Sequence, residues 1–575
     1  MTHAATSRTS TIGRGLLAGL AAASFWLLAF PWPFAGASSM AMLGPLAWYA
    51  GLLAPLPIVW IGWTAPRRWL AGLAVGVGTV PLWAVHHAWV RDVSFAGVFP
   101  LIAYLAVWPM LAVVGLSLAR RATGGAAAAL VIPTIWVGLE FIRGEILFGG
   151  YAWFLAGQPM IEFLPLARSA SVGGVYAVSW LVVAVSGIAV GARERLPEAR
   201  RSMRTGWIAT AVLAGAISAG LLVRPGGPSG RAVPVAAVQT NVAQNNKIAP
   251  TREQVRGDFI DLLRLIEQAA EAGAHVIITP ETVFQGLALD DDGAERAAAM
   301  FGSGVNGFRD ALLDTQRALG RSILIGSLTR EGLRLEPSPD GEVLAADATY
   351  NSLYLLAGGA VTQPRYDKLR PTPFGETLPY IDAFPWLRDI VLRIGLGASG
   401  FDFGLDRGGE PRALVVPTPS GDVHVATPIC FESSMAPVVR SLVRADEKVE
   451  LLVVVTNDGW FGRFHAGRAM HLLMGRWRCV EHALPMVRSA NTGFSAVIDR
   501  DGRVRASLGA GVEGVLAAEV SIGGGGTVYA AVGEVPGAVC AVLAVALSVA
   551  GAVRGARRGG REPVTADEEG TDDDE

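Results

Sequence analysis

The chain contains 575 residues, of which 51% are hydrophobic and only 17% are charged. This charged fraction is well below the ~25% of average soluble domains, which excludes an ordinary soluble enzyme. The net charge of -2 provides no excess of basic residues for phosphate contacts, so we expect no nucleic-acid partner. Three cysteines, Cys430, Cys479 and Cys540, are too few and too scattered for a disulfide framework or a zinc site.

Eight apolar stretches have lengths in or near the range of a membrane-spanning helix, about 17–25 residues. They cover residues 12–30, 41–63, 69–90, 95–118, 126–142, 172–190, 207–223 and 528–553. We therefore predict a seven-helix membrane domain over residues 1–224, an extramembrane domain over 231–526 and a closing membrane helix over 527–553. A tail over 554–575 is first basic and then acidic.

The arginines of the connecting segments indicate the orientation in the membrane, because positive residues stay cytoplasmic. One side holds Arg8, Arg14, Arg67, Arg68, Arg120, Arg121, Arg193, Arg195, Arg200, Arg201, Arg204, Arg554, Arg557, Arg558 and Arg561; the other holds Arg91, Arg143 and Arg168. Both termini are therefore expected in the cytoplasm and residues 231–526 outside it. A cleaved signal peptide is the alternative for the first stretch, but its loss would break the alternation of charge.

After a Gly- and Pro-rich boundary at residues 225–230, short β-rich runs alternate with amphipathic helices. Strands are expected over 233–238, 275–279, 322–327, 351–356, 423–427, 451–456, 486–489 and 495–499, and helices over 252–272, 307–319, 434–444 and 467–481. Alternation of this kind predicts an α/β domain.

Three polar segments follow predicted strands of this domain. Cys430 lies in ATPICFESS, between an apolar strand and a helix, where backbone N–H groups can bind an oxyanion. Glu281 follows a buried strand in IITPETVF, and YDKLRPTPFGE contains Lys368 and Glu376. A buried cysteine is often only a small hydrophobic residue, and a loop Lys or Glu is usually just solvated. Together, however, the three groups could meet at one site.

The order Glu281, Lys368, Cys430 resembles the triad of the nitrilase or carbon–nitrogen hydrolase superfamily, and with the membrane helices the chain resembles the apolipoprotein N-acyltransferases. Further matching stretches are AFPWP at 29–33, RGEILFGGYAWF at 143–154, AAVQTNV at 236–242, TNDGWFG at 456–462 and RSANTGFSAVIDRDG at 488–502. The resemblance implies a polytopic helical membrane domain joined to a nitrilase-like αββα sandwich, in a bacterial inner membrane.

The resemblance also implies a reaction. A phospholipid would give its acyl chain to Cys430 as a thioester, and the α-amine of a diacylglyceryl-cysteine at the N-terminus of an apolipoprotein would accept it. Glu281 would be the general base and Lys368 would stabilise the oxyanion together with the N–H of Phe431. Glu376 and Glu432 are expected in supporting roles. No cofactor or metal is expected.

Two regions are candidates for binding lipid. Tyr151 and Trp153 resemble family residues that face the active site, with interfacial belt aromatics as the alternative. The apolar segment 384–403, which contains Trp386 and Leu387, is predicted to be a flap at the membrane interface, with a helix packed in the core as the alternative.

Other readings stay open at this stage. A membrane-tethered amidase acting on a small soluble amide would use the same triad, and a transporter or scaffold with a degenerate domain would need none of it. The GxGxxG spelled by residues 302–307 follows no clear strand and is not expected to bind a dinucleotide. His424, six residues before the cysteine, could form a Cys–His dyad, although an edge histidine is commoner. Thr279, Ile248 and Phe431 replace aromatic residues frequent in the family, which leaves the lipid preference open.

Overall fold

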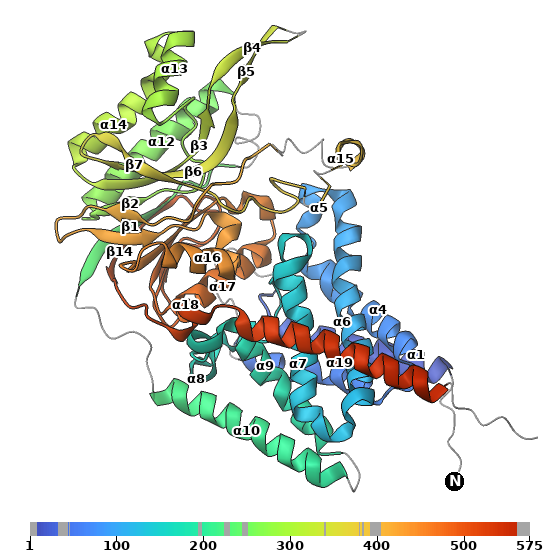
Figure 1. Cartoon of the computed structure of the whole chain (residues 1–575). Coiled ribbons are helices and arrows are strands. Elements are labelled where there is room, and N and C mark those ends of the chain that lie inside the picture. The colour runs from blue at the N-terminus through green and yellow to red at the C-terminus, as the bar shows by residue number, and fades with distance from the viewer. Residues whose placement is uncertain are drawn as a thin grey trace, which may run out of the picture.

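The computed structural model describes residues 8–32, 44, 46–193, 198–222, 231–243, 251–338, 341–378, 380–381, 384–391 and 404–559. Figure 1 shows two parts, a bundle of helices and a layered α/β domain that lies against one end of the bundle. The helix α19 near the C-terminus returns to the bundle after the α/β domain.

Within the described residues, seven helices are long and apolar enough to cross a membrane. The bundle contains α1 (Arg8–Ala29), α2 (Ala47–Leu53), α3 (Pro55–Thr64), α4 (Arg68–His86), α5 (Val90–Val93), α6 (Phe95–Thr123), α7 (Ala128–Phe141), α8 (Leu164–Ala167), α9 (Ala170–Gly191), α10 (Glu198–Leu222) and α19 (Val535–Gly559). Large apolar side chains such as Leu17, Trp207 and Val542 are exposed on the outside of these helices. Such a surface is the one a bilayer would cover.

Two predicted spans differ from the observed helices. The stretch 41–63 contains two short helices, α2 and α3, although Ala54 between them keeps helical angles of φ -56° and ψ -40°. Pro55 has no N–H for the hydrogen-bond ladder, which interrupts the helix without bending it sharply. The predicted closing span begins as the short helix α18 (Val528–Val532), and Gly533 at φ +62° separates it from α19.

The α/β domain has two six-stranded sheets. The first has the order β14 (Gly514–Ser521), β1 (Ala232–Gln239), β2 (Val276–Ile278), β3 (Ser322–Glu331), β6 (Ala348–Ala357), β7 (Ala360–Asp367); the second has β13 (Val504–Ser507), β12 (Ala496–Ile498), β11 (Met486–Ala490), β10 (Leu451–Thr456), β9 (Val423–Ala426), β8 (Leu414–Val416). The central strands β1, β2 and β3 are parallel, as are β9, β10 and β11. A separate hairpin joins β4 (Arg334–Ser338) and β5 (Gly341–Ala345).

The alternation of side chains along each strand builds a four-layer sandwich. In β1, Val233 and Val235 belong to the core between the two sheets, whereas Ala236 and Val238 pack with α12 (Arg252–Glu271) and α14 (Gly307–Leu319). The short helix α13 (Asp291–Phe301) lies near them. The helices α16 (Ala436–Arg444) and α17 (His465–His482) cover the second sheet. This arrangement confirms the predicted αββα sandwich.

The helix α17 is buried along its whole length from Ala466 to His482. Leu472 and Cys479 pack against the second sheet, whereas Met470, Leu473 and Trp477 pack into the core of the membrane bundle. The two parts of the molecule therefore share this helix as a common wall.

Candidate active site

The residues of the site come from the ends of four strands. Glu281 follows β2, Lys368 follows β7, Cys430 opens the turn η7 (Cys430–Ser434) after β9, and Asn457 follows β10. The carboxyl ends of neighbouring parallel strands share one edge of a sheet, which brings residues distant in sequence together.

A buried ionic cluster joins Glu281, Lys368 and Glu376. The Lys368 Nζ lies 3.3 Å from Glu281 Oε1 and 2.9 Å from Glu376 Oε2, and the side chain of Lys368 is only 1% exposed. Asn351 in β6 donates to Glu281 Oε1 at 2.7 Å, and the N–H of Asn457 donates to Glu281 Oε2 at 2.6 Å. Both oxygens of Glu281 are therefore held in place.

The charges of this cluster stabilise one another. Burial opposes the charge of Lys368, but the carboxylates of Glu376 and Glu281 outweigh burial and raise the pKa of the ammonium. Burial likewise opposes ionisation of Glu376, but the Lys368 charge outweighs it and lowers the pKa of that carboxyl. Lys368 therefore stays positive at neutral pH, where it can stabilise a developing oxyanion.

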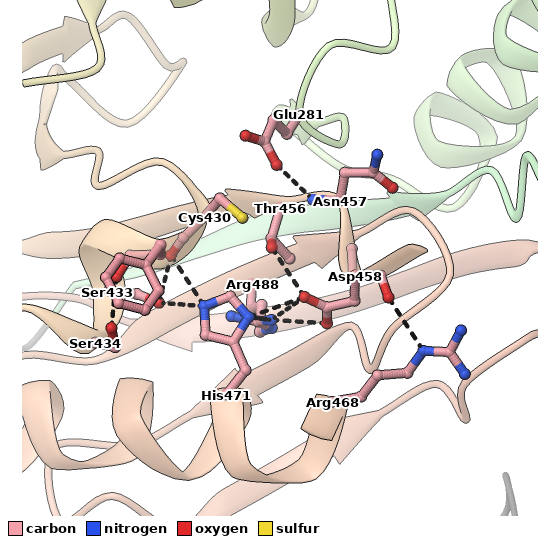
Figure 2. Close-up of polar contacts among 12 residues, drawn as sticks. Glu281, Cys430, Ser433, Ser434, Thr456, Asn457, Asp458, Arg468, His471 and Arg488 are labelled. Carbon is pink, nitrogen blue, oxygen red and sulfur yellow. Dashed lines mark hydrogen bonds and ion pairs between the residues drawn. The ribbon is translucent and has the colours of Figure 1, made fainter. Parts of the chain in front are cut away.

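Cys430 has φ +53°, a left-handed conformation that a residue with a Cβ rarely adopts. The preceding residue, Ile429, still pairs with Val455 of β10, so the chain turns sharply at the cysteine. In Figure 2 the sulfur points away from this turn, toward the side on which Glu281 and Asn457 lie. Burial, and next the negative charge of Glu281, raises the pKa of the thiol, and the Lys368 charge offsets only part of the increase. The resting group is thus a protonated thiol.

Glu432 lies beneath the turn and does not line the cavity. Its Oε2 accepts hydrogen bonds from the N–H of Ile429 at 2.8 Å and from the hydroxyl of Tyr366 at 2.8 Å, and its Oε1 accepts one from the N–H of Arg370 at 3.0 Å. Burial raises its pKa to about 7. Glu432 therefore links the cysteine turn to the segment that follows Lys368.

A cavity of about 600 Å³ opens over the sulfur between the two parts of the molecule. Its lining includes Cys430, Phe431 and Glu376 from the α/β domain, and Tyr151 and Trp153 from the segment after the π-helical turn η2 (Ile142–Ile146). Most of the other lining residues are apolar or aromatic, and they include Tyr104, Phe148, Phe374, Trp460 and Phe461. The volume falls within the range of pockets that hold small apolar ligands.

The residues predicted to contact lipid lie in two places, in the cavity wall and at the exposed surface. The ring of Trp153 is buried and stacks on Tyr151 at 5.6 Å, and the Tyr151 hydroxyl hydrogen-bonds to His87 Nε2 at 2.7 Å. Trp386 lies on the short helix α15 (Pro385–Val391) and is 64% exposed. The side chain of Leu387 and the rest of the predicted flap, residues 392–403, lie outside the described residues.

Several polar residues of the site, including Asn351, Asn457 and His471, were not predicted from the sequence. The side chain of Asn351 and the N–H of Asn457 donate to Glu281, and His471 contacts the carbonyl of Cys430. Only Asn457, directly after a buried strand, had a sequence signal comparable to that of Glu281. His424, considered as a dyad partner, instead pairs with Asp446 at 2.5 Å. Among the described residues, no group of three or more His, Cys, Asp or Glu side chains is placed to hold a metal ion.

Comparisons with known proteins place these features in a family. Residues 234–528 match the carbon–nitrogen hydrolase family, and residues 22–188 match the apolipoprotein N-acyltransferase N-terminal domain. Among solved structures, an amidase of the nitrilase superfamily from Nesterenkonia AN1 is 16% identical, covering 50% of this chain and 91% of the amidase, with a TM-score of 0.33.

Curated relatives match most of the chain. The apolipoprotein N-acyltransferase of Caulobacter vibrioides is 31% identical over 90% of this chain and 91% of the relative. That of Bradyrhizobium diazoefficiens is 31% identical over 80% of this chain and 79% of the relative. The chain belongs to the apolipoprotein N-acyltransferase family.

Proposed function

We propose that this protein transfers an acyl chain from a membrane phospholipid, through a thioester on Cys430, to the N-terminal amine of a diacylglyceryl-cysteine on an apolipoprotein. One observation carries the proposal: a single apolar cavity contains the cysteine and is lined by both the helical bundle and the hydrolase-like domain. A site for two bulky lipids needs such a cavity, and a covalent intermediate allows the lipids to bind in turn.

In the first half-reaction, Glu281 accepts the thiol proton as the sulfur attacks the ester carbonyl carbon. Lys368 and the backbone N–H of Phe431 stabilise the oxygen that becomes negative, and one such donor is typically worth about 3 kcal/mol of barrier. The C–O bond then breaks, the acyl group stays on the sulfur, and Glu281 returns the proton to the lysophospholipid oxygen. Base assistance is needed because burial keeps the thiol protonated.

In the second half-reaction, the uncharged amine attacks the thioester carbonyl. Glu281 accepts a proton from the nitrogen, the C–S bond breaks, and the proton returns to the sulfur. Glu376 keeps Lys368 charged and in place through both steps, and Glu432 keeps the cysteine turn in place. The product is an amide on the apolipoprotein, and the thiol is regenerated.

The proposal includes a location. We place the protein in the inner membrane, and the distribution of arginines supports both termini in the cytoplasm with the hydrolase-like domain on the outer side. Both lipid substrates reside in that membrane. We further propose that Tyr151 and Trp153 contact the acyl chain, and that Trp386 and Leu387 contact lipid at the interface.

Acyl-enzyme formation tests the reaction directly. The purified full-length protein is mixed with vesicles of acyl-labelled phospholipid, and we expect label on the protein that hydroxylamine removes. A Cys430→Ala variant should carry none, and a diacylglyceryl-cysteine peptide should chase the label into an amide. Folded protein that takes no label from several phospholipids, yet hydrolyses a small soluble amide, would instead identify a membrane-tethered amidase.

A further inference from the structure

A second polar cluster lies beneath the nucleophile and takes no part in the mechanism above. It contains Asp458 in the turn η8 (Asp458–Phe461), His471 in α17 and Arg488 in β11, and all three side chains are at most 2% exposed. The Arg488 guanidinium donates to Asp458 Oδ2 at 2.8 Å, and His471 Nδ1 lies 2.9 Å from Asp458 Oδ1 (Figure 2). Burial opposes the charge of Asp458, but Arg488 and His471 outweigh it and lower the pKa of the carboxyl.

The other edge of the His471 ring contacts the nucleophile's own backbone. His471 Nε2 lies 3.0 Å from the carbonyl oxygen of Cys430, and the Ser433 hydroxyl donates to the same oxygen at 2.8 Å. A carbonyl oxygen only accepts hydrogen bonds, so Nε2 carries a proton in this contact. The contacts of Nδ1 with Asp458 and Arg488 fix the orientation of the ring.

The hydrogen bonds to the Cys430 carbonyl stabilise the unusual backbone conformation of the turn. A residue with a Cβ stays in the left-handed region only where its surroundings hold it there, and Cys430 has φ +53°. Thr456, at the end of β10, belongs to the same cluster: its side chain lowers the pKa of the Cys430 thiol and donates to Asp458 Oδ1 at 3.0 Å. Asp458 is thus connected to the Cys430 carbonyl through His471 and contacts Thr456 directly.

The ring of His471 also forms part of the cavity wall. It stacks on Trp153 with centroids 6.4 Å apart and packs against Phe461 at 6.0 Å. One side chain therefore joins the wall of the cavity to the backbone of the nucleophile.

We propose that His471 is a positioning residue for Cys430. His471 donates a hydrogen bond to the Cys430 carbonyl and so directs the sulfur toward the acyl carbonyl, while Asp458 and Arg488 fix the orientation of the imidazole. The inference rests on the proposed function, since it assumes that Cys430 takes the acyl group. His471 acts through the backbone and exchanges no proton with the substrate.

A pair of substitutions separates this role from packing. His471→Leu keeps the approximate volume and removes the hydrogen bond, whereas His471→Gln restores an N–H donor on the same side. We expect His471→Leu to slow formation of the hydroxylamine-labile acyl-enzyme about 100-fold, the loss typical of a misplaced reacting group, with the phospholipid KM changed less than about threefold. His471→Gln should recover at least about tenfold of that loss. Acylation by His471→Leu at the wild-type rate, or no recovery in His471→Gln, would overturn the inference.

Ser433→Ala provides a second test if His471→Leu does not fold. It removes the other donor to the same carbonyl, and we expect about a tenfold slower acylation at an unchanged KM; a wild-type rate would contradict the anchoring of the carbonyl. Cys430→Ala is measured in parallel. Labile label on Cys430→Ala would refute the proposed function itself, whereas its absence together with full acylation of His471→Leu would refute only the role of His471.

Discussion

Replacing Lys368 with Met should separate what the buried ammonium contributes to stability from what it contributes to chemistry. The Nζ lies 2.9 Å from Glu376 and 3.3 Å from Glu281, so each attraction is about 5–6 kcal/mol at an effective dielectric constant of 20. Desolvation of the three charges offsets much of this. Removing one partner of a buried ion pair costs about 3–5 kcal/mol in practice, because the remaining charge is left uncompensated.

Lys368→Met leaves two carboxylates facing one vacated position. We expect thermal unfolding in detergent to occur roughly 6–20 °C lower than in the wild type, since each kcal/mol shifts the unfolding temperature of a large domain by about 2–4 °C. We also expect acyl-enzyme formation to fall at least about 100-fold through loss of the oxyanion donor.

The double variant Lys368→Met, Glu376→Gln decides between the two contributions. It leaves one buried carboxylate and so restores the net charge of the wild-type cluster, which should recover most of the lost thermal stability. It should recover none of the activity, because the ammonium is still missing. If the double variant regained acylation along with stability, Lys368 would be structural and the oxyanion assignment would be wrong.

Three further substitutions test other parts of the site. Gly326→Ala places a Cβ 2.5 Å from the Pro280 carbonyl oxygen and 2.9 Å from the Cα of Glu281. We therefore expect the free energy of unfolding to fall by about 1–3 kcal/mol and acylation to slow at least tenfold. A normal acylation rate would show that the Glu281 loop tolerates displacement. Trp386→Ala should raise the KM for phospholipid in vesicles severalfold and leave the rate with a short-chain, detergent-dispersed donor unchanged, whereas equal effects on both would argue against an interfacial contact. Glu281→Gln removes the negative charge that helps raise the Cys430 pKa, so iodoacetamide labelling of Cys430 should shift to lower pH while acylation falls, and a shift to higher pH would contradict the electrostatics.

The sequence predicted the central strands of both sheets because they are continuous apolar runs. All eight predicted strands are present, and Glu281 follows one of them as expected. Of the six strands it missed, β7, β8, β13 and β14 are the edges of the two sheets and β4 and β5 form the separate hairpin, and exposed or half-exposed positions weaken the apolar pattern in these strands. β7 also contains Pro364, which an edge strand tolerates but which favours the prediction of a loop.

The residues around the triad were harder to predict, for a different reason. His471 is 13 residues from Asp458 and 41 from Cys430, and no spacing rule relates a helix to the underside of a strand-end turn. Asn351 lies within a buried strand, where an amide has no local signal until its partner Glu281 is placed.

The helix α17, which packs on both parts of the molecule, gives a physical reason why a hydrolase-like site favours acyl transfer over hydrolysis. Its faces pack on the sheet and on the bundle at once, so the cavity over Cys430 is walled by both parts of the molecule. Most of the cavity lining is apolar or aromatic and so offers few hydrogen-bond partners to water near the sulfur. A thioester formed there would be protected from hydrolysis, and under the proposed function it would persist until an amine carried on a lipid anchor reaches the cavity from the bilayer.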